Sequence, residues 1–210
     1  MRASPLLLLA LAAVFVLRVG ATEELPTDPA NVHPLQAGVA APTATLDSID
    51  GSTYNLAEVF AAKPTILIFY RGGWCPFCSR QLAGLADSEL EFRRLGYQII
   101  AVSPDAVPAL DKTAATQHLR FRLLSDRQQK ISAAYRVAYR IPASDEPDYR
   151  ANGISLPLIP GKKDFWLTNP TAFVIGRDGL IKFVYTNSDP SVTVSKDGLL
   201  QAARAAVTGS

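Results

Sequence analysis

The sequence has few of the side chains that bind transition metals: two cysteines, two histidines and one methionine among 210 residues. A structural zinc site needs about four ligands. Only His33 and His118 are available to join the cysteines as soft donors, and they lie far apart in the chain. We interpret each histidine as a surface or capping residue, and we expect neither a metal ion nor another cofactor.

The sequence also lacks a hydrophobic run that crosses a membrane comfortably. Apolar residues fill 6–17, whereas a membrane-spanning helix needs about 20. Arg2 precedes this run, Arg18 follows it, and Val19-Gly20-Ala21 offers a small-residue cleavage site. The pattern predicts a signal peptide over 1–21 and an exported protein, periplasmic or secreted, with no stable membrane insertion once the segment is removed. A retained membrane anchor is the alternative interpretation.

A strong excess of either charge is absent as well. The chain carries 21 basic and 19 acidic side chains, and the loss of Arg2 and Arg18 with the signal peptide leaves 19 of each. A neutral mature chain gives no reason to expect a nucleic-acid partner. Residues 22–38 show no periodicity and predict a flexible leader, and no internal repeat is visible. The length of 39–210 favours one domain.

Apolar strands alternate with helices in that domain. The predicted strands cover 65–70, 97–102, 121–124, 172–175 and 181–185, and the predicted helices cover 76–94, 106–117 and 198–206. This order predicts an α/β protein with a mixed central sheet and helices on both faces. Asp126 is expected to cap the helix that follows it. Residues 139–168, interrupted by prolines and glycines, are expected to form an irregular insertion over the core.

Both cysteines follow the most apolar strand, in the run Phe69-Tyr70-Arg71-Gly72-Gly73-Trp74-Cys75-Pro76-Phe77-Cys78. Pro76 fits the first turn of a helix. The thiols therefore open a helix, where unpaired N–H groups and the helix dipole stabilise a thiolate. Arg71 and Arg80 are near enough in sequence to add positive charge. The spacing places both side chains on nearly one helix face, within disulfide reach.

Two other interpretations of the pair are weaker. A disulfide across so small a ring removes little unfolded-state entropy and is a poor structural staple. Half of a zinc site lacks its remaining ligands. The pair is therefore predicted to be redox-active.

Several motifs from about residue 38 to the C-terminus follow one pattern. They are Ala41-Pro42 with Leu46 and Asp50-Gly51, the run from Phe69 to Cys78, Val102-Ser103-Pro104-Asp105, Leu124-Ser125-Asp126, and Thr171 to Ile175 with Asp178-Gly179. On these residues the chain resembles the peroxiredoxin and alkyl hydroperoxide reductase (AhpC/TSA) family of the thioredoxin-like superfamily, in its Cys-x-x-Cys branch. The resemblance implies a thioredoxin-like fold and thiol-dependent reduction of a small peroxide, with a thioredoxin-like or other thiol reductant as electron donor.

The chain departs from the family pattern where peroxide is held. In an alignment through Phe69-Tyr70 and Gln81, Cys78 falls on the peroxidatic cysteine of the family and Cys75 replaces its threonine. Arg71 stands where the family usually has proline. The resemblance therefore does not say which residues of this chain bind the peroxide. The family also uses a distant arginine for this purpose, and charge alone suggests Arg71 or Arg136 in its place.

Other neighbours of the pair resemble thioredoxins instead. Pro170 stands before Thr171, where the family would place an arginine, and it resembles the cis-proline that faces the cysteine pair in thioredoxins. Trp74 precedes the pair as it does there. The resemblance thus makes Cys75 and Cys78 catalytic, with Trp74, Pro76, Pro170 and Arg71 shaping the site.

Two mechanisms remain open at this point. In a peroxidase, Cys78 attacks the peroxide and Cys75 condenses with the sulfenic acid. In a thioredoxin-like thiol:disulfide oxidoreductase, Cys75 attacks a protein disulfide and Cys78 resolves the mixed disulfide. A scaffold that has kept the fold is a third interpretation, and it gives no reason for two intact cysteines.

Overall fold

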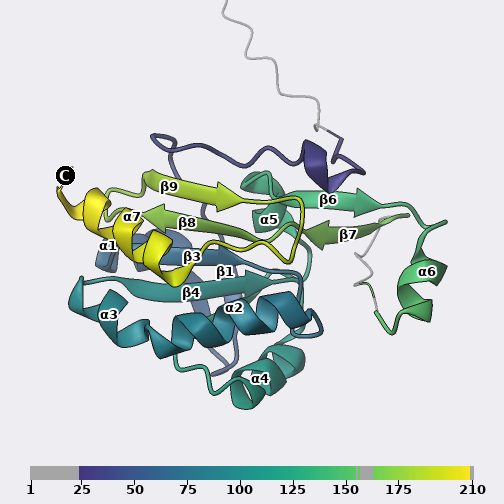
Figure 1. Ribbon diagram of the computed structural model, residues 1–210, viewed down its shortest axis with the longest axis horizontal. Helices are drawn as coiled ribbons and strands as arrows, with labels where there is room; N and C mark the ends of the chain where they lie inside the picture. Colours follow the sequence, from purple (N-terminus) through teal and green to yellow (C-terminus); the bar gives the residue numbers. More distant parts are fainter. Residues whose placement is uncertain (1–23, 155, 157–162, 209–210) are drawn as a thin grey trace, which may run out of the picture.

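The computed structural model describes residues 24–154, 156 and 163–208 of the chain. The predicted signal peptide over 1–21 lies outside these residues. Among the residues described, no helix combines the length and the apolarity needed to cross a membrane. Figure 1 shows one large twisted sheet with helices packed on it and a smaller pair of strands at one end.

The large sheet has seven strands in the order β2-β1-β5-β4-β3-β8-β9. Strands β3, β4 and β5 are parallel, while β1 and β8 join them antiparallel on either side. The sheet is therefore mixed, as predicted. Its strands are β1 (Thr45–Ser48), β2 (Thr53–Asn55), β3 (Thr65–Phe69), β4 (Gln98–Ser103), β5 (Arg122–Ser125), β8 (Thr171–Ile175) and β9 (Ile181–Thr186).

Strand β3 lies at the centre, and all five of its residues are buried. Side chains alternate between the two faces of a strand, so Ile66 and Ile68 join one core cluster, while Leu67 and Phe69 join the other. Both faces are covered by helices, which confirms the predicted α/β architecture. The helices are α1 (Leu56–Ala62), α2 (Pro76–Asp87), α3 (Glu89–Arg94), α4 (Val107–Thr116), α5 (Lys130–Ala134), α6 (Glu146–Ala151) and α7 (Lys196–Thr208).

The helices divide between the faces by their buried residues. Residues of α2, α3, α4 and α7 pack on the Ile66 and Ile68 side, and residues of α1 and α5 pack on the Leu67 and Phe69 side. Figure 1 shows α2, α3 and α7 together in front of the sheet. Because β3 runs straight into the turn before α2, this packing fixes the position of the cysteines at the carboxyl end of the central strand, where open α/β sheets place ligands.

Two helix predictions have different outcomes. The single helix predicted over 76–94 is wrong, because the chain breaks at Ser88 into α2 and α3. The Ser88 hydroxyl donates to the Gly84 carbonyl at 3.2 Å, and such side-chain bonds compete with regular helix geometry. The prediction for Asp126 is confirmed in part: Gln129 occupies the N-cap position of α5, but the Asp126 carboxylate accepts hydrogen bonds from the Ile131 and Ser132 backbone amides at the start of this helix.

The segment 139–168 contains more regular structure than expected. Strands β6 (Ala138–Ile141) and β7 (Phe165–Thr168) pair antiparallel as a second, two-stranded sheet, and α6 lies between them in sequence. The prolines bound these elements instead of disrupting them: Pro142 follows β6, and Pro147 occupies the first turn of α6, where proline is tolerated. Residues 155 and 157–162 of this segment lie outside the described part of the chain.

Residues 24–38, the described part of the expected leader, lie along the domain. A short 3₁₀ helix at Pro29–Asn31 is followed by Val32, which is buried in a small cluster with Tyr139. The Leu35 and Gly38 amides donate to the carbonyls of Tyr135 and Ile181. The segment thus forms part of the domain surface beside β6, instead of extending freely from it.

Candidate functional site

The site begins at a glycine turn between β3 and α2. Gly72 adopts φ +142°, a conformation that residues with a Cβ rarely adopt. The Gly73 amide donates to the Asp105 carboxylate at 2.8 Å, which ties the turn to the end of β4. An atom added at the Gly73 Cβ position would overlap the Thr113 hydroxyl on α4. The backbone at Gly73 therefore lies too close to α4 to leave room for a side chain at this position.

Gly73→Ala is therefore expected to destabilise the reduced protein by about 1–3 kcal/mol, the usual cost of overpacking. The added methyl group displaces the Thr113 hydroxyl from its bond to the Ala109 carbonyl. Gly84→Ala in α2 is the matched control, because nothing lies within 4 Å of its Cβ position, and it is expected to gain about 0.5–1 kcal/mol from helix propensity. Urea unfolding of both variants measures the difference; equal stability of the two would contradict this description of the turn.

Both cysteines lie in the first turn of α2, as predicted. Cys75 is the N-cap, and its Sγ accepts a hydrogen bond from the Cys78 amide at 3.4 Å. No disulfide bond joins the two cysteines, and the Cys78 S–H donates to Cys75 Sγ with the sulfurs 2.7 Å apart. A disulfide bond is about 2.05 Å long, so its formation requires little movement. Cys75 is 2% exposed and Cys78 is fully buried.

The two thiols have opposite acidities. The hydrogen bond from Cys78 is the main reason that the pKa of Cys75 falls to about 6; the Cys78 amide and the positive charge of Arg71 act in the same direction, against the cost of burial. The pKa of Cys78 is raised, because its proton is held by Cys75 and because burial and the nearby negative charge disfavour a second thiolate. Cys75 is therefore the thiolate at neutral pH, with Cys78 as its proton donor.

Arg71 and Trp74 lie beside the pair, as predicted. Arg71 lowers the pKa of Cys75 through its charge, and its Nη2 donates to the Tyr139 hydroxyl at 3.0 Å. Trp74 is half-buried and packs between the core cluster that holds the cysteines and the small cluster around Tyr139. It covers the turn, with its Nε1 2.7 Å from the Cβ position of Gly72.

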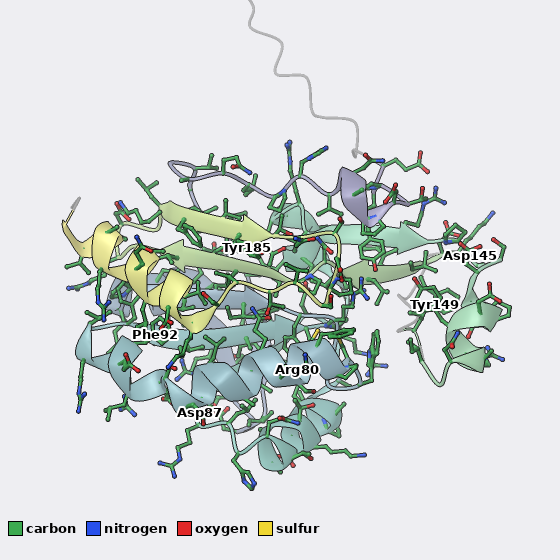
Figure 2. The ribbon with its side chains drawn as sticks, viewed as in Figure 1. Arg80, Asp87, Phe92, Asp145, Tyr149 and Tyr185 are labelled. Carbon is green, nitrogen blue, oxygen red and sulfur yellow. The ribbon has the colours of Figure 1, made fainter. Side chains whose placement is uncertain are left out.

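Three further residues near the cysteines have different surroundings in the structure: Pro170, Pro76 and Arg80. The prediction of a cis-proline at 170 is wrong, since the described residues contain no cis peptide bond. Pro170 is nevertheless buried at the start of β8, where Thr171 pairs with Phe69 at the end of β3. Pro76 is exposed in the first turn of α2. Arg80 is exposed on α2 (Figure 2), and its guanidinium carbon lies 5.8 Å from the centre of the Phe77 ring.

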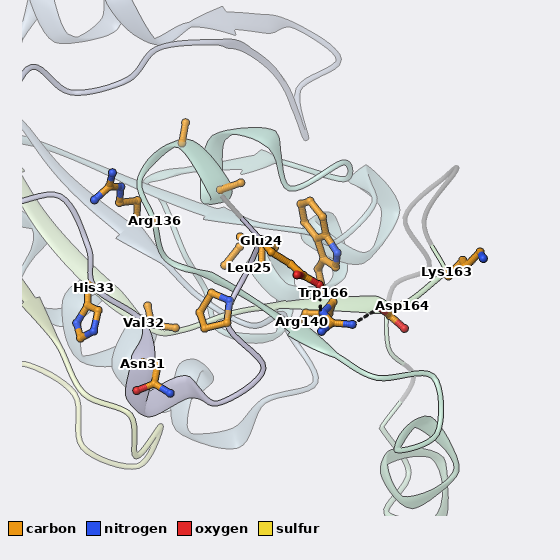
Figure 3. Close-up of a pocket in the computed structure, with 14 residues that line it drawn as sticks. Glu24, Leu25, Asn31, Val32, His33, Arg136, Arg140, Lys163, Asp164 and Trp166 are labelled. Carbon is orange, nitrogen blue, oxygen red and sulfur yellow. Dashed lines mark hydrogen bonds and ion pairs between the residues drawn. The ribbon is translucent and has the colours of Figure 1, made fainter. Parts of the chain in front are cut away.

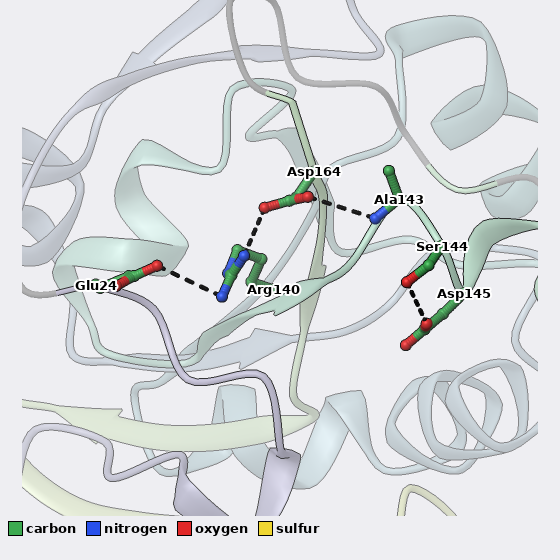
Figure 4. A network of polar contacts seen from close by, with 6 residues as sticks. All are labelled: Glu24, Arg140, Ala143, Ser144, Asp145 and Asp164. Carbon is green, nitrogen blue, oxygen red and sulfur yellow. Dashed lines mark hydrogen bonds and ion pairs between the residues drawn. The ribbon is translucent and has the colours of Figure 1, made fainter.

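Arg136 lies in a different place. It lines a hollow of about 800 Å³ on the side of β6 that Ala138 and Arg140 face, and neither cysteine contributes to that hollow. Figure 3 shows this hollow with Arg136 and Arg140 on its wall. Arg140 is neutralised there by Asp164 at 2.7 Å and Glu24 at 3.4 Å (Figure 4). Of the two arginines considered from the sequence, Arg71 is the one whose charge lowers the pKa of both sulfurs.

Sequence reasoning missed Tyr139, Asp105 and Thr113 as parts of this site. Asp105 lies in one of the family motifs, which assigns it no role, and Tyr139 lies in the segment expected to form an irregular insertion. No local signal connects Tyr139 to Arg71, which is 68 positions away. In the described residues, no group of three or more His, Cys, Asp or Glu side chains is placed to hold a metal ion.

Comparison with known proteins places the chain in a family. Residues 37–184 match the sequence model of the AhpC/TSA family. The chain belongs to the AhpC/TSA family. It is 31% identical over 106 residues to peroxiredoxin Bcp of Escherichia coli (strain K12), covering 50% of this chain and 67% of that protein. Its identity to the chloroplastic peroxiredoxin Q of Populus jackii is 27% over 150 residues, 71% of this chain and 60% of that protein.

The chain thus spans about three fifths of the length of the chloroplast relatives of the AhpC/TSA family that it matches. Among solved structures, the peroxidoxin BcpB of Mycobacterium tuberculosis is similar, with a TM-score of 0.63 at 22% identity over 81% of this chain and 97% of that one. This likeness confirms the thioredoxin-like fold expected from the sequence.

Proposed function

We propose that this chain is a thiol-dependent peroxidase that reduces small hydroperoxides through Cys75 and Cys78. The observation that carries the proposal is the hydrogen-bonded sulfur pair, in which Cys75 has a pKa of about 6 and a proton donor 2.7 Å away. Both sulfurs are buried, which favours a substrate of a few atoms. Membership of the AhpC/TSA family and similarity to proteins named peroxiredoxin support the same function.

In the proposed reaction, the Cys75 thiolate attacks the terminal oxygen of the hydroperoxide and the O–O bond breaks. This order is the reverse of the one that the family alignment implies, in which Cys78 attacks first; we propose it because the pKa of Cys75 is lowered while that of Cys78 is raised. Cys75 becomes a sulfenic acid, and the leaving alkoxide or hydroxide takes up a proton. Cys78 Sγ then attacks Cys75 Sγ, its own proton leaves with the displaced hydroxide as water, and the disulfide forms. Two thiols and one hydroperoxide thus give one disulfide, one alcohol and one water. The positive charge of Arg71 stabilises both the thiolate and the departing oxygen.

The coupling between the thiols sets the order of these steps. While Cys75 is a thiolate, its negative charge and its hold on the shared proton keep Cys78 protonated. Once Cys75 is oxidised, that charge is gone, and Cys78 loses its proton more easily. The second sulfur therefore becomes nucleophilic only when there is a sulfenic acid to attack.

Exchange with protein disulfides is the second candidate function, because the same sulfur pair at a helix N-terminus serves that chemistry too. The burial of Cys75 argues against it, since another protein's disulfide must reach the sulfur directly. We propose that a thioredoxin-like or other thiol reductant restores the pair after turnover. We also propose that the chain is exported, which rests on residues 1–21 alone.

The test is the rate at which hydrogen peroxide oxidises the reduced protein at pH 7, measured by stopped-flow tryptophan fluorescence and by loss of free thiols. A pKa of about 6 raises the thiolate fraction at this pH by about thirtyfold over an ordinary cysteine. We expect the pair to react faster than free cysteine by more than this factor. A rate at or below that of free cysteine, together with cysteine-dependent reduction of insulin, would replace the peroxidase with the exchange enzyme.

A further inference from the structure

Arg71 is a partly buried cation with few side-chain contacts. Its Nη2 donates to the Tyr139 hydroxyl at 3.0 Å, and its Cζ lies 6.0 Å from the centre of the Tyr139 ring. Its Nε is buried and has no hydrogen-bond partner within the described part of the chain. The Tyr139 hydroxyl is therefore the side-chain contact that defines where this guanidinium lies.

Tyr139 comes from the small sheet instead of the seven-stranded sheet. It lies on β6 opposite Leu167 of β7, and it is 2% exposed. Its neighbours on the strand, Ala138 and Arg140, line the hollow on the other side, as strand alternation requires. Leu167, Ile141 and Val32 pack around Tyr139, and Trp74 closes the cluster from the cysteine turn. The β6–β7 pair thus holds Tyr139 in a fixed position against the site.

We infer that Tyr139 is a positioning residue that holds the Arg71 guanidinium beside the Cys75 and Cys78 sulfurs, so that the β6–β7 pair completes the active site. The inference rests on the proposed function, in which the guanidinium stabilises the thiolate and the departing oxygen. It assigns a role to a segment that sequence reasoning treated as an irregular insertion.

The charges around Arg71 indicate the effect of its hydrogen bond to Tyr139. The guanidinium acts on both sulfurs, and it also acts on the exposed carboxylate of Asp189, in the segment after β9. Asp189 and the thiolate compete for the same cation. Without the Tyr139 hydroxyl, the guanidinium is free to turn toward Asp189 and the solvent, and the thiolate loses its positive neighbour.

The experiment compares Tyr139→Phe with Tyr135→Phe. Tyr135 is the matched control, because it is also fully buried and its hydroxyl has no partner among the described residues, and because it packs on the opposite face of the sheet. The readouts are the thiolate absorbance at 240 nm of the reduced protein against pH, and the rate of oxidation by hydrogen peroxide at pH 6. For Tyr139→Phe we expect a rise of about half a unit to one unit in the thiolate pKa and about a twofold to fivefold slower oxidation. For Tyr135→Phe we expect no change.

A double-variant cycle separates positioning from packing. Arg71→Met is expected to raise the thiolate pKa at least as far as Tyr139→Phe does, and adding Tyr139→Phe to Arg71→Met is expected to change it no further. An unchanged pKa in Tyr139→Phe, an equal shift in Tyr135→Phe, or a full additional shift in the double variant would each overturn the inference. If the shifts appear as expected but the native protein does not reduce peroxide, the positioning role stands and the proposed function fails.

Discussion

The Cys75→Ser variant is expected to lose peroxide reduction, with the rate falling roughly 10³-fold or more, as when an enzyme loses its nucleophile. The physical reason is that Cys75 alone is a thiolate at neutral pH. The remaining Cys78 is fully buried, and burial still raises its pKa after the contribution of Cys75 is lost, so little of it is a thiolate at pH 7. The measurement is the single-turnover oxidation of each reduced variant by hydrogen peroxide at pH 7.

Cys78→Ser is the matched variant and is expected to behave differently. Serine at this position keeps an O–H donor toward Cys75, so the Cys75 thiolate keeps its hydrogen bond and is oxidised at close to the native rate. Turnover stops after one equivalent, because no second sulfur is present to form the disulfide. The account is contradicted if Cys78→Ser is inert toward peroxide while Cys75→Ser reacts at the native rate.

The second large effect concerns pH. Alkylation of Cys75 by iodoacetamide, followed in the Cys78→Ser variant where it is the one remaining cysteine, is expected to show a midpoint near the pKa of about 6. The folded pKa lies below the ordinary value of about 8.5. The thiolate is therefore fully present above about pH 7, and it is lost as pH falls through 6, with the rate falling about tenfold for each further unit.

Cys78→Ala tests the cause of this shift. Alanine removes the hydrogen-bond donor that contributes most to the low pKa of Cys75. The midpoint is expected to rise by about one unit or more, since a hydrogen bond to a charged group contributes about 1.5–3 kcal/mol. A midpoint that stays near 6 in Cys78→Ala would show that a donor at position 78 does not stabilise the thiolate.

The parts of the fold that were predicted correctly have strong local signals. The apolar run at β3, the proline after Cys75 and the hairpin of β8 and β9 each carry the pattern of their element in a few neighbouring residues. The break at Ser88 and the pairing of β6 with β7 do not. A serine hydrogen bond to the Gly84 carbonyl is one of several choices open to that side chain, and two four-residue strands separated by a long connection show too few alternations to be recognised.

The residues of the candidate site show the same difference between local and long-range signals. The positions of Cys75, Cys78, Trp74 and Arg71 follow from a single stretch of sequence, so the motif identified them together. The acidity of each thiol depends on the distance between the sulfurs and on their burial, which only the folded chain determines. The contact of Arg71 with Tyr139 joins two distant segments, and the Asp105 carboxylate, two residues beyond β4, accepts from the Gly73 amide after the neighbouring strand β3.

The most direct test of the central claim is the identity of the sulfur that becomes a sulfenic acid. Reduced Cys75→Ser and Cys78→Ser proteins are treated with one equivalent of hydrogen peroxide in the presence of a dimedone-type trap, and the adduct is located by mass spectrometry of the peptides. The sulfur geometry predicts an adduct on Cys75 in the Cys78→Ser protein and almost none in the Cys75→Ser protein. An adduct formed rapidly on Cys78, with Cys75 unlabelled, would contradict it and assign the first attack to Cys78.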